Sequence, residues 1–445
     1  MKPTPSPLTY FTTTRRALPC AMLVLLLAAS ISLRAGTVDT GGTPVVEKLT
    51  SSIWDQQYLL GDWGGARTQL EKEGITFQLG NIGDLMGDVS GSQEHHLAYF
   101  GRFRASADID FNKLADFDGE FFFSGIWQYG ENLSGRYLGT NTLTSSIAGV
   151  NSVRIDQLWY QQGFDNDKFK IKLGQVAAVN EFGATDFFDI LMNDELGYAP
   201  NAIFNTRQPF SPAGKPGAIL TLDLSDLRPG LYVKGGVFTT YKNPYKPDAY
   251  GLDYNDDFGH GVAASLEFGF KEQNPTHAGV YKLGLNADPS SIYFNPATNR
   301  EYRGDFNAYA TVEKTVYHPT NRDGQLSTDK GLDLLFQFVG EPGDRNSIQY
   351  EFTTGGRYTG LIAGRDKDKA GFGIIYSNNG SAFSQANEQA GGSGLGGETT
   401  LEIDYQVNPA AWLSIQGDAQ YIIDPGGNAN RDNILVLGLR TIVQF

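Results

Sequence analysis

The feature that most constrains the fold of this chain is a two-residue period of apolar and polar side chains, repeated in short segments from about residue 75 onward. In residues 401–407 every odd position is apolar and every even position is polar, and residues 413–421 repeat the pattern. Residues 101–111 and 435–445 alternate in the same way. Successive side chains of a β-strand point to opposite faces of a sheet, so each segment predicts a strand with one apolar and one polar face. The pattern therefore predicts an all-β protein.

Turn sequences separate the predicted strands, as in Asp165-Asn166-Asp167 and Asp424-Pro425-Gly426-Gly427. They alternate with longer polar stretches, expected as loops at 130–151, 240–258, 286–303 and 380–397. Short turns at one end and long loops at the other are typical of a transmembrane β-barrel. The region 74–445 holds 372 residues, and a strand with its connections takes about 23, which predicts about 16 antiparallel strands.

The polar faces favour a membrane barrel over a soluble β-sandwich or propeller. They carry charges at successive alternate positions, which suits a wet lumen better than a dry core. After residue 35 no apolar run of about 20 residues occurs, so a helical membrane protein is excluded. The mean hydropathy of −0.30 is then the average of an apolar outer face and a polar inner face. We expect outer-membrane lipid to surround the barrel.

The last residue gives a further sign of this class. Phe445 follows a run of alternating apolar residues, and such an aromatic ending resembles the signal that the outer-membrane barrel assembly machinery recognises. We therefore expect that machinery to be a partner of the chain through Phe445.

The first residues have the order of a secretory leader. Lys2, Arg15 and Arg16 precede an apolar run at 17–33, and small residues follow. A retained N-terminal anchor is the alternative. The expected organisation is a signal peptide at 1–35, a linker at 36–53, a short periplasmic helical segment at 54–74 and the transmembrane barrel at 75–445. Asp62 is the expected N-cap of the helix, and Gly74 its stop.

Removal of the leader makes the net charge of the chain more negative. The whole chain has 35 basic and 50 acidic residues, and the leader holds four of the basic ones, so the rest carries a net charge of −19. A chain this acidic repels phosphates, which argues against nucleic acid as a partner. The single cysteine, Cys20, leaves with the leader, so no disulfide framework is expected.

Several motifs resemble a known family. The sequence Leu-Leu-Gly-Asp-Trp-Gly-Gly-Ala-Arg at 59–67, followed by Gly74-Ile75, resembles the N-terminal signature of the carbohydrate-selective porin family of OprB type. Further similar stretches lie at 84–91, 157–162, 172–175 and 358–368, the last with Asp366 where the family pattern has a proline. The resemblance covers about residues 55–445. It implies an outer-membrane barrel that admits mono- or oligosaccharides by passive diffusion, with no cofactor and no enzymatic activity.

A sugar pathway needs side chains that donate to and accept from hydroxyl groups. Arginines that face carboxylates across a lumen would also create a transverse field that orients dipolar solutes. Alternate positions on the early strands supply such residues, and the alternative is that they are solvated wall residues away from the narrowest point. The candidates for the lumen and its constriction are Arg102, Arg104, Glu120, Gln128, Arg154 and Asp156.

Other constellations fit chemistry less well. His95 and His96 are adjacent, so on a strand they would point apart, and Asp253, Asp256 and Asp257 lack the pattern of a calcium loop. We therefore expect no metal. A barrel lipase would need a Ser/His pair, and no nucleophile elbow is present. A general diffusion porin and a secreted glycan-binding β-protein remain as alternatives to a sugar-selective porin.

Overall fold

The computed structural model divides the chain into two units, Met1–Thr50 and Ser51–Phe445. The structure describes residues 52–92, 94–185, 189–196, 200–241, 250–252, 254, 261–272, 274, 276–320 and 324–445. The expected signal peptide, nearly all of the expected linker and the three aspartates at 253, 256 and 257 lie outside these residues.

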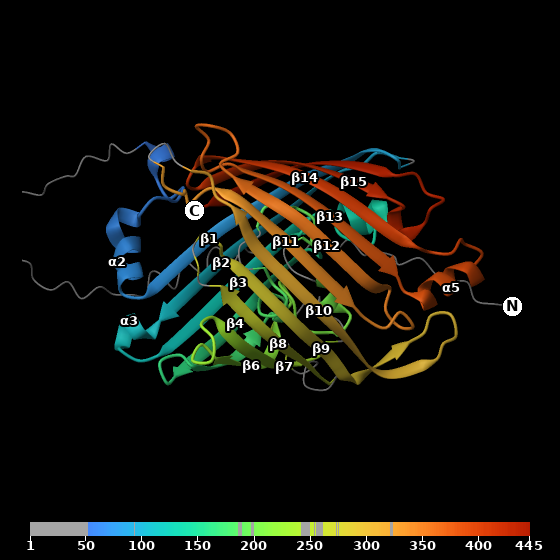
Figure 1. Ribbon diagram of the computed structural model, residues 1–445, viewed down its shortest axis with the longest axis horizontal. Helices are drawn as coiled ribbons and strands as arrows, with labels where there is room; N and C mark the ends of the chain where they lie inside the picture. The colour runs from blue at the N-terminus through green and yellow to red at the C-terminus, as the bar shows by residue number, and fades with distance from the viewer. Residues whose placement is uncertain are drawn as a thin grey trace, which may run out of the picture. The chain divides into compact units, whose positions relative to one another are not determined.

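The described residues form a closed antiparallel barrel in which each strand pairs with its neighbours in the chain, and β1 pairs with β16 (Figure 1). The prediction of about 16 strands is confirmed. The strands are β1 (Ile75–Ser90), β2 (Leu97–Asp110), β3 (Gly119–Gly130), β4 (Ser152–Phe164), β5 (Phe169–Val176), β6 (Lys215–Asp223), β7 (Leu231–Thr239), β8 (Val262–Glu272), β9 (Gly279–Phe294), β10 (Glu301–Tyr317), β11 (Gly331–Gly340), β12 (Ile348–Thr359), β13 (Lys369–Asn379), β14 (Gly397–Ala410), β15 (Leu413–Ile423) and β16 (Ile434–Gln444).

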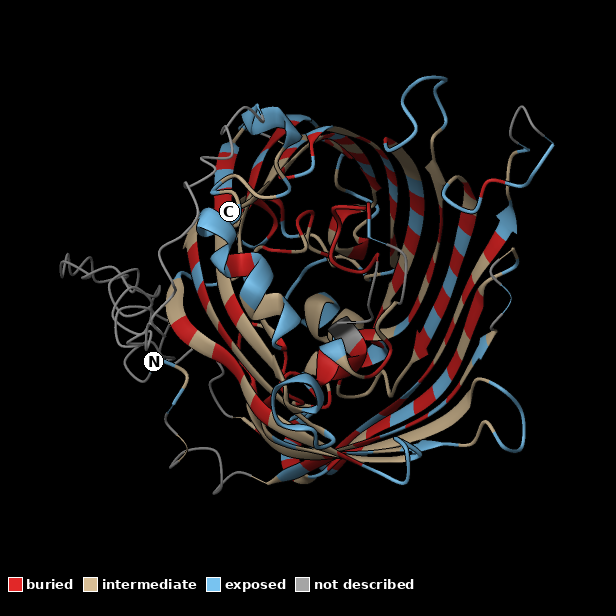
Figure 2. Ribbon diagram, turned by 90° about the vertical axis from the view of Figure 1, so that its left-hand side faces the viewer, coloured by how far each residue is buried: buried red, intermediate tan, exposed pale blue. Residues whose placement is uncertain are grey.

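The alternation in the sequence becomes an alternation of burial. Figure 2 looks along the barrel and shows buried and exposed bands that alternate along the strands. On β9 Leu283 and Leu285 are 63% and 55% exposed, whereas the next residue, Asn286, is 1% exposed. The outward side chains are apolar and the inward ones polar, which is the arrangement of a barrel in lipid. Trp127 faces outward beside Tyr129, with ring centroids 4.7 Å apart, as expected of an interfacial aromatic.

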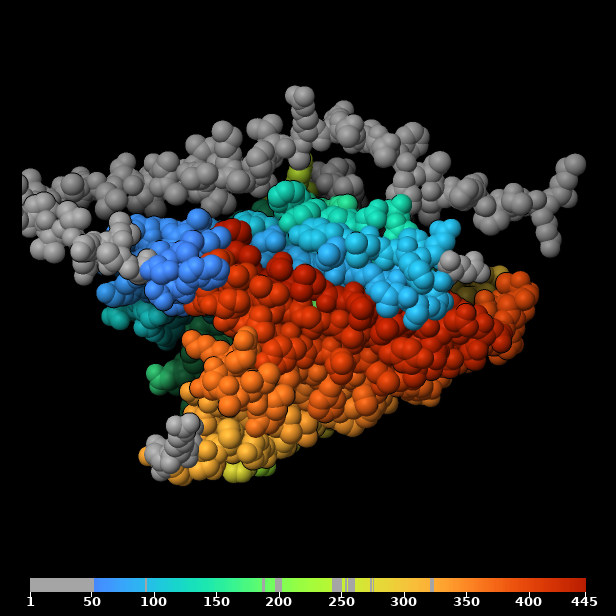
Figure 3. All heavy atoms as spheres, turned by 90° about the horizontal axis from the view of Figure 1, so that it is seen from above, coloured from blue at the N-terminus to red at the C-terminus, as the bar shows by residue number. Residues whose placement is uncertain are grey.

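The barrel closes where the two ends of the described chain meet. Residues 80–88 of β1 pair in register with residues 436–444 of β16. Figure 3 shows the blue and red ends of the colour scale side by side on the surface. The backbone N–H of Phe445 donates to the carbonyl of Leu79 over 2.8 Å, so the seam stays paired up to the last residue. Closure leaves no unpaired edge among the sixteen strands that the structure describes.

The predicted loops are partly right. The connection after β3 (131–151) and the one after β13, which holds helix α5 (Ser381–Gln389), are long, as expected. The predicted loop at 286–303 is wrong, because this stretch forms the paired ends of β9 and β10 with a short turn between them. The polar residues of this stretch suggested a loop, but several of them, including Asn286 and Asp288, are buried residues on the inner face of a strand. Most of the predicted loop 240–258 lies outside the described residues.

The N-terminal segment contains short helical turns, in agreement with the helical segment expected before the barrel. It contains two 3-10 turns, η1 (Ile53–Asp55) and η2 (Trp63–Gly65), and helix α2 (Ala66–Lys72). Asp62 is not the N-cap of α2, because Gly64 and Gly65 at positive φ interrupt the helix and Gly65 takes the cap position. Asp62 Oδ1 still accepts from the backbone N–H of Thr68 over 2.8 Å. No helix in the described part of the chain is long and apolar enough to cross a membrane.

Candidate functional site

The main structure inside the barrel is the connection between β5 and β6, residues 177–214, which we call the inner connection. It holds η4 (Ala178–Asn180) and α4 (Pro200–Phe204). Figure 2 shows buried segments within the ring of strands. Several of its apolar residues, among them Ala178, Phe182 and Ile203, belong to one buried cluster with wall residues such as Phe238 and Tyr309. Ile190, Leu191 and Leu196 belong to a separate cluster with Leu335 and Ile375 of the wall. A connection that packs on the wall narrows the lumen.

Polar wall residues hold the first half of the inner connection. Glu181 accepts from Lys172 of β5 over 2.6 Å and from Lys234 of β7 over 3.2 Å. The N–H of Gly183 donates to Glu267 of β8 over 2.9 Å. Asp189 forms an ion pair of 2.7 Å with Arg357 of β12. The segment thus reaches from β5 to the wall at β12.

The second half is anchored further around the barrel. The N–H groups of Met192 and Asn193 donate to Glu402 of β14 over 2.5 and 3.2 Å. After α4 begins, the carbonyl of Ala202 accepts from Asn307 of β10 over 2.6 Å. Buried polar side chains of the wall, Glu402 and Asn307, thus give hydrogen-bond partners to backbone groups of the inner connection. Without them these backbone groups would be buried without partners.

A second connection, residues 131–151 between β3 and β4, also meets the inner wall. Arg102 of β2 and Gln128 of β3, which lie opposite each other in register, both donate to the carbonyl of Ile147, over 3.2 and 2.9 Å. The two connections touch each other, since the N–H of Leu143 donates to Asp194 over 2.8 Å. The structure thus places Arg102 and Gln128 together, as anchors of a connection.

Arg104 and Asp156 form an ion pair, with Nη2 and Oδ2 3.3 Å apart. Ser211 at the end of the inner connection completes the group, because its hydroxyl donates to Asp156 over 3.1 Å and accepts from Arg104 over 3.1 Å. Asp156 is fully buried, whereas the Arg104 side chain stays 39% exposed. The guanidinium is therefore held through its Nη2, and part of the side chain stays exposed.

A β-bulge on β4 decides which of its residues face inward. Between Ser124 and Gly125 of β3 the register shifts, so Gln157 pairs with Ser124 and Ile155 with Gly125. Asp156 is the extra residue of the bulge, and both Asp156 and Arg154 before it are buried. The bulge reverses the alternation beyond it and turns Trp159 inward. The buried Trp159 ring lies between Phe122, at a centroid distance of 5.1 Å, and the Lys172 ammonium at 3.8 Å.

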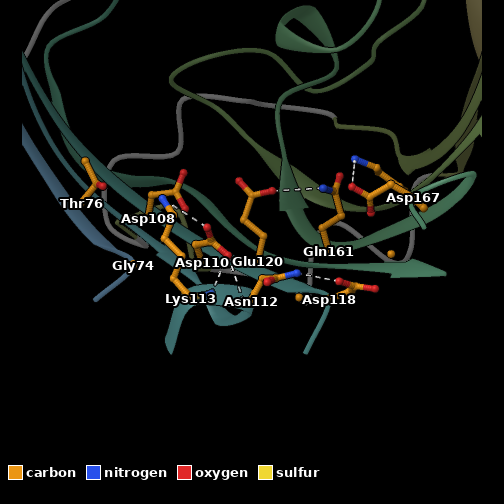
Figure 4. Close-up of a pocket in the computed structure, with 13 residues that line it drawn as sticks. Gly74, Thr76, Asp108, Asp110, Asn112, Lys113, Asp118, Glu120, Gln161 and Asp167 are labelled. Carbon is orange, nitrogen blue, oxygen red and sulfur yellow. Dashed lines mark hydrogen bonds and ion pairs between the residues drawn. The ribbon is translucent and has the colours of Figure 1, made fainter. Parts of the chain in front are cut away.

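Glu120 lies apart from the other candidates, in a pocket of about 340 Å³. Figure 4 shows Asp108, Glu120 and Gln161 side by side on the wall, with Gln161 donating to Glu120 over 3.1 Å. Asp110, Lys113, Asn112, Lys170 and the turn residue Asp167 complete much of the lining. The pocket belongs to the end of the barrel at which α2 and the short helix α3 (Phe111–Ala115) lie.

Burial and neighbouring charges shift the pKa values of carboxyl groups on the inner connection. Burial opposes ionisation of Glu181, but the neighbouring Lys234 and Lys172 outweigh it and hold the pKa of this carboxyl below its usual value. Burial raises the pKa of Asp194 and Glu195 well above the usual range, and the nearby Glu351 carboxylate adds to both shifts. Burial also opposes ionisation of Asp189, but Lys369 and Arg357 outweigh it and hold the pKa of this carboxyl below its usual value. On the described part of the inner connection, Glu181 and Asp189 are thus held ionised, whereas Asp194 and Glu195 resist ionisation.

Sequence reasoning missed the largest feature of the site. The inner connection carries apolar side chains without a two-residue period, and this break in the alternation is the signal that could have indicated it. It also missed Gln161, Lys170, Lys172 and Lys234, although the lysines of β5 occupy alternate positions that mark one face.

A closed 16-stranded barrel with an apolar outer face, a polar inner face and an inward-folded connection defines the class of outer-membrane porins. The profile of the family "Carbohydrate-selective porin, OprB family" matches residues 94–445. The chain belongs to this family, and it is an outer-membrane channel for carbohydrates. The family resemblance of the sequence is thereby confirmed.

Individual relatives are distant in sequence but similar over nearly their whole length. Porin B of Pseudomonas aeruginosa is 23% identical over 433 residues, covering 88% of this chain and 92% of the relative. The putative porin QuiX of Acinetobacter baylyi is 23% identical over 450 residues, covering 89% and 95%. A high-pH structure of Pseudomonas putida OprB, 20% identical, superposes with a TM-score of 0.80 and covers 89% of this chain and all of that one. This last likeness confirms the fold.

Proposed function

We propose that sugars cross this porin by diffusion past two polar stations on the inner wall. The first is the Arg104–Asp156–Ser211 group beside the inner connection. The second is the pocket that holds Asp108, Glu120 and Gln161. Channel transport without a catalytic step is part of this proposal, as is the assignment of the transported class to neutral mono- or oligosaccharides.

The pocket is the observation that carries the proposal. Its size of about 340 Å³ lies within the usual range of small-molecule sites. Carboxylates accept hydrogen bonds from hydroxyl groups, while the amide of Gln161 and the ammonium of Lys170 can donate. A neutral solute rich in hydroxyl groups matches this mixed lining. The solvent-open position of the pocket keeps binding weak enough for release.

Arg104 supports the first station. Asp156 and Ser211 fix the guanidinium by one edge, and the exposed remainder can donate to a hydroxyl or ring oxygen. Trp159 is a poor stacking platform, because Phe122 and Lys172 already lie against its ring. The proposed recognition therefore depends on hydrogen bonds more than on stacking.

The test is the conductance of single channels in planar bilayers during titration with glucose and maltose. The double variant Asp108→Asn with Glu120→Gln should raise the half-blocking sugar concentration roughly tenfold, since hydrogen bonds to charged groups contribute about 1.5–3 kcal/mol. It should also weaken cation preference, because two negative charges leave the wall. The control is Asp226→Asn, which removes an exposed carboxylate that pairs with Lys168 on a turn.

Three outcomes are informative. An unchanged half-blocking concentration removes the pocket from the sugar path. A wild-type channel whose current ignores sugars indicates a general diffusion porin. Detection of the protein in the soluble fraction, without channel activity, would favour the secreted glycan-binding alternative.

A further inference from the structure

Three buried carboxylates meet on the inner wall away from the proposed sugar stations. Glu402 and Asp404 lie two residues apart on β14, and Asp418 lies on β15 directly opposite Asp404 in register. One carboxylate oxygen from each lies within 4.8 Å of the others. The three residues are only 2%, 6% and 7% exposed. Like charges directly opposite on neighbouring strands repel each other, and burial strengthens that repulsion.

The structure offers these charges little compensation. The nearby Arg440 of β16 is committed to Asp84, to which its Nε and Nη2 donate over 2.8 and 2.7 Å. Among the described residues no lysine or arginine forms an ion pair with any of the three carboxylates. Asp404 Oδ1 accepts from Gln416, but the buried Oδ2 has no hydrogen-bond partner in the described part of the chain.

We propose that Glu402, Asp404 and Asp418 bind a divalent cation, of which Ca²⁺ fits best. Calcium takes oxygen ligands at about 2.3–2.6 Å, so oxygens around one ion lie at most about 5 Å apart, which agrees with this cluster. Carboxylate ligands without histidine or cysteine favour calcium or magnesium over zinc. The free Oδ2 of Asp404 supplies an oxygen that the protein otherwise leaves without a partner.

The position of the site gives the ion a structural effect. Glu402 accepts from the N–H groups of Met192 and Asn193 on the inner connection. Gln416, which contacts Asp404, donates to the carbonyl of Ile190 on the same segment over 2.5 Å. An ion that fixes Glu402 and Asp404 therefore fixes the segment 190–193 against β14 and β15.

The experiment uses the full protein, folded in detergent without lipopolysaccharide and stripped with a chelator. Isothermal titration with CaCl2 at neutral pH should show one saturable site, and the heat-unfolding midpoint should rise when Ca²⁺ is added. In the double variant Asp404→Asn with Asp418→Asn the affinity should fall at least about 100-fold, since even loss of an outer-shell partner costs about 10–100-fold. The control Asp226→Asn, which changes an exposed carboxylate elsewhere, should bind like the wild type.

Gel mobility before and after heating shows whether each variant is folded, and only folded protein is titrated. Absence of both a binding heat and a shift in the midpoint for stripped wild-type protein would overturn the proposal and indicate that the carboxylates share protons instead. Equal binding by the folded double variant would also overturn it, because the ion would then lie elsewhere. Sugar plays no part in the titration, so its result is independent of the proposed sugar stations.

Discussion

Arg67 shows how one residue of the N-terminal signature supports the barrel. Its side chain is 2% exposed and donates to the carbonyls of Phe445 and Phe77, each over 2.9 Å. Its guanidinium lies 3.3 Å from the ring centroid of Tyr58 and 4.7 Å from that of Trp63. The two glycines before it turn the chain so that helix α2 presents this arginine to the seam between β1 and β16. The glycines and the arginine of the N-terminal signature therefore serve to fasten the seam of the barrel.

Replacement of Arg67 by alanine should destabilise the folded barrel by about 2 kcal/mol, because two partly buried carbonyls lose a charged donor. Arg67→Lys should fall between alanine and wild type, since an ammonium cannot reproduce the planar fork. Urea unfolding in detergent, followed by gel mobility, measures the change. Lys72→Ala, on the exposed side of the same helix, is the control. A wild-type midpoint for Arg67→Ala would show that the seam holds without this contact.

At the scale of elements, the inner connection depends on ion pairs as much as on apolar packing. Lys172 and Lys234 come from β5 and β7, and both reach Glu181. Arg357 and Lys369, from β12 and β13, both reach Asp189 at the far side. Glu181 and Asp189 thus each tie the connection to two strands. Ion pairs to β5 and β7 on one side of the wall and to β12 and β13 on the other thus fix the position of the connection.

The pairing of Glu181 gives a defined pH dependence. Its pKa in the folded protein lies below the ordinary 4.5, so its stabilisation is fully present above that value and is lost as the pH falls through the folded pKa. Channel current noise, as a measure of movement of the connection, should stay constant from pH 7 to about 4.5 and rise below it. Glu181→Gln should be noisy already at pH 7 and change little on acidification.

Asp226→Asn serves as the control for this titration, because its carboxylate pairs with Lys168 on an exposed turn. It should follow the wild-type profile. If Glu181→Gln also follows the wild-type profile, the two lysines do not hold the connection through this carboxylate.

At the scale of the whole molecule, the outward apolar side chains decide where the protein is stable. Large exposed apolar residues recur on the strands, and a water-soluble protein rarely exposes such an extensive apolar surface. Lipid covers it at no cost, while the polar inner ring is satisfied by the connections that fold inward. The two faces together suit a single location, the outer membrane.

Leu285→Arg, near the middle of β9 on the outer face, should destabilise the barrel in lipid by about 2–4 kcal/mol, because a charge would face the hydrocarbon. Unfolding by denaturant from lipid vesicles measures the loss. Leu227→Arg, at an even more exposed leucine in the turn between β6 and β7, should cost little. Equal costs at both positions would contradict the assignment of the outer face to lipid.

Much of the candidate site followed from the sequence, though not its arrangement. The sequence predicts six inward-facing candidates: Arg102, Arg104, Glu120, Gln128, Arg154 and Asp156. The structure places Arg104 beside Asp156 and Arg102 beside Gln128, with Glu120 in the separate pocket. Their contacts with Ser211 and Ile147 could not be predicted, because those residues lie far away along the chain on connections without a period. Whether these six residues contact sugar stays a prediction.

The sequence by itself determined the all-β class, the closed barrel of about 16 strands and the faces of most strands, because side-chain alternation is a local property of extended backbone. The tertiary structure alone decided what fills the lumen. The bulge on β4 reversed the faces of its later residues, and the inner connection brought Glu181 to Lys234 of β7, Asp189 to β12 and Met192 to β14. Such contacts depend on closure of the barrel, and no local pattern records them.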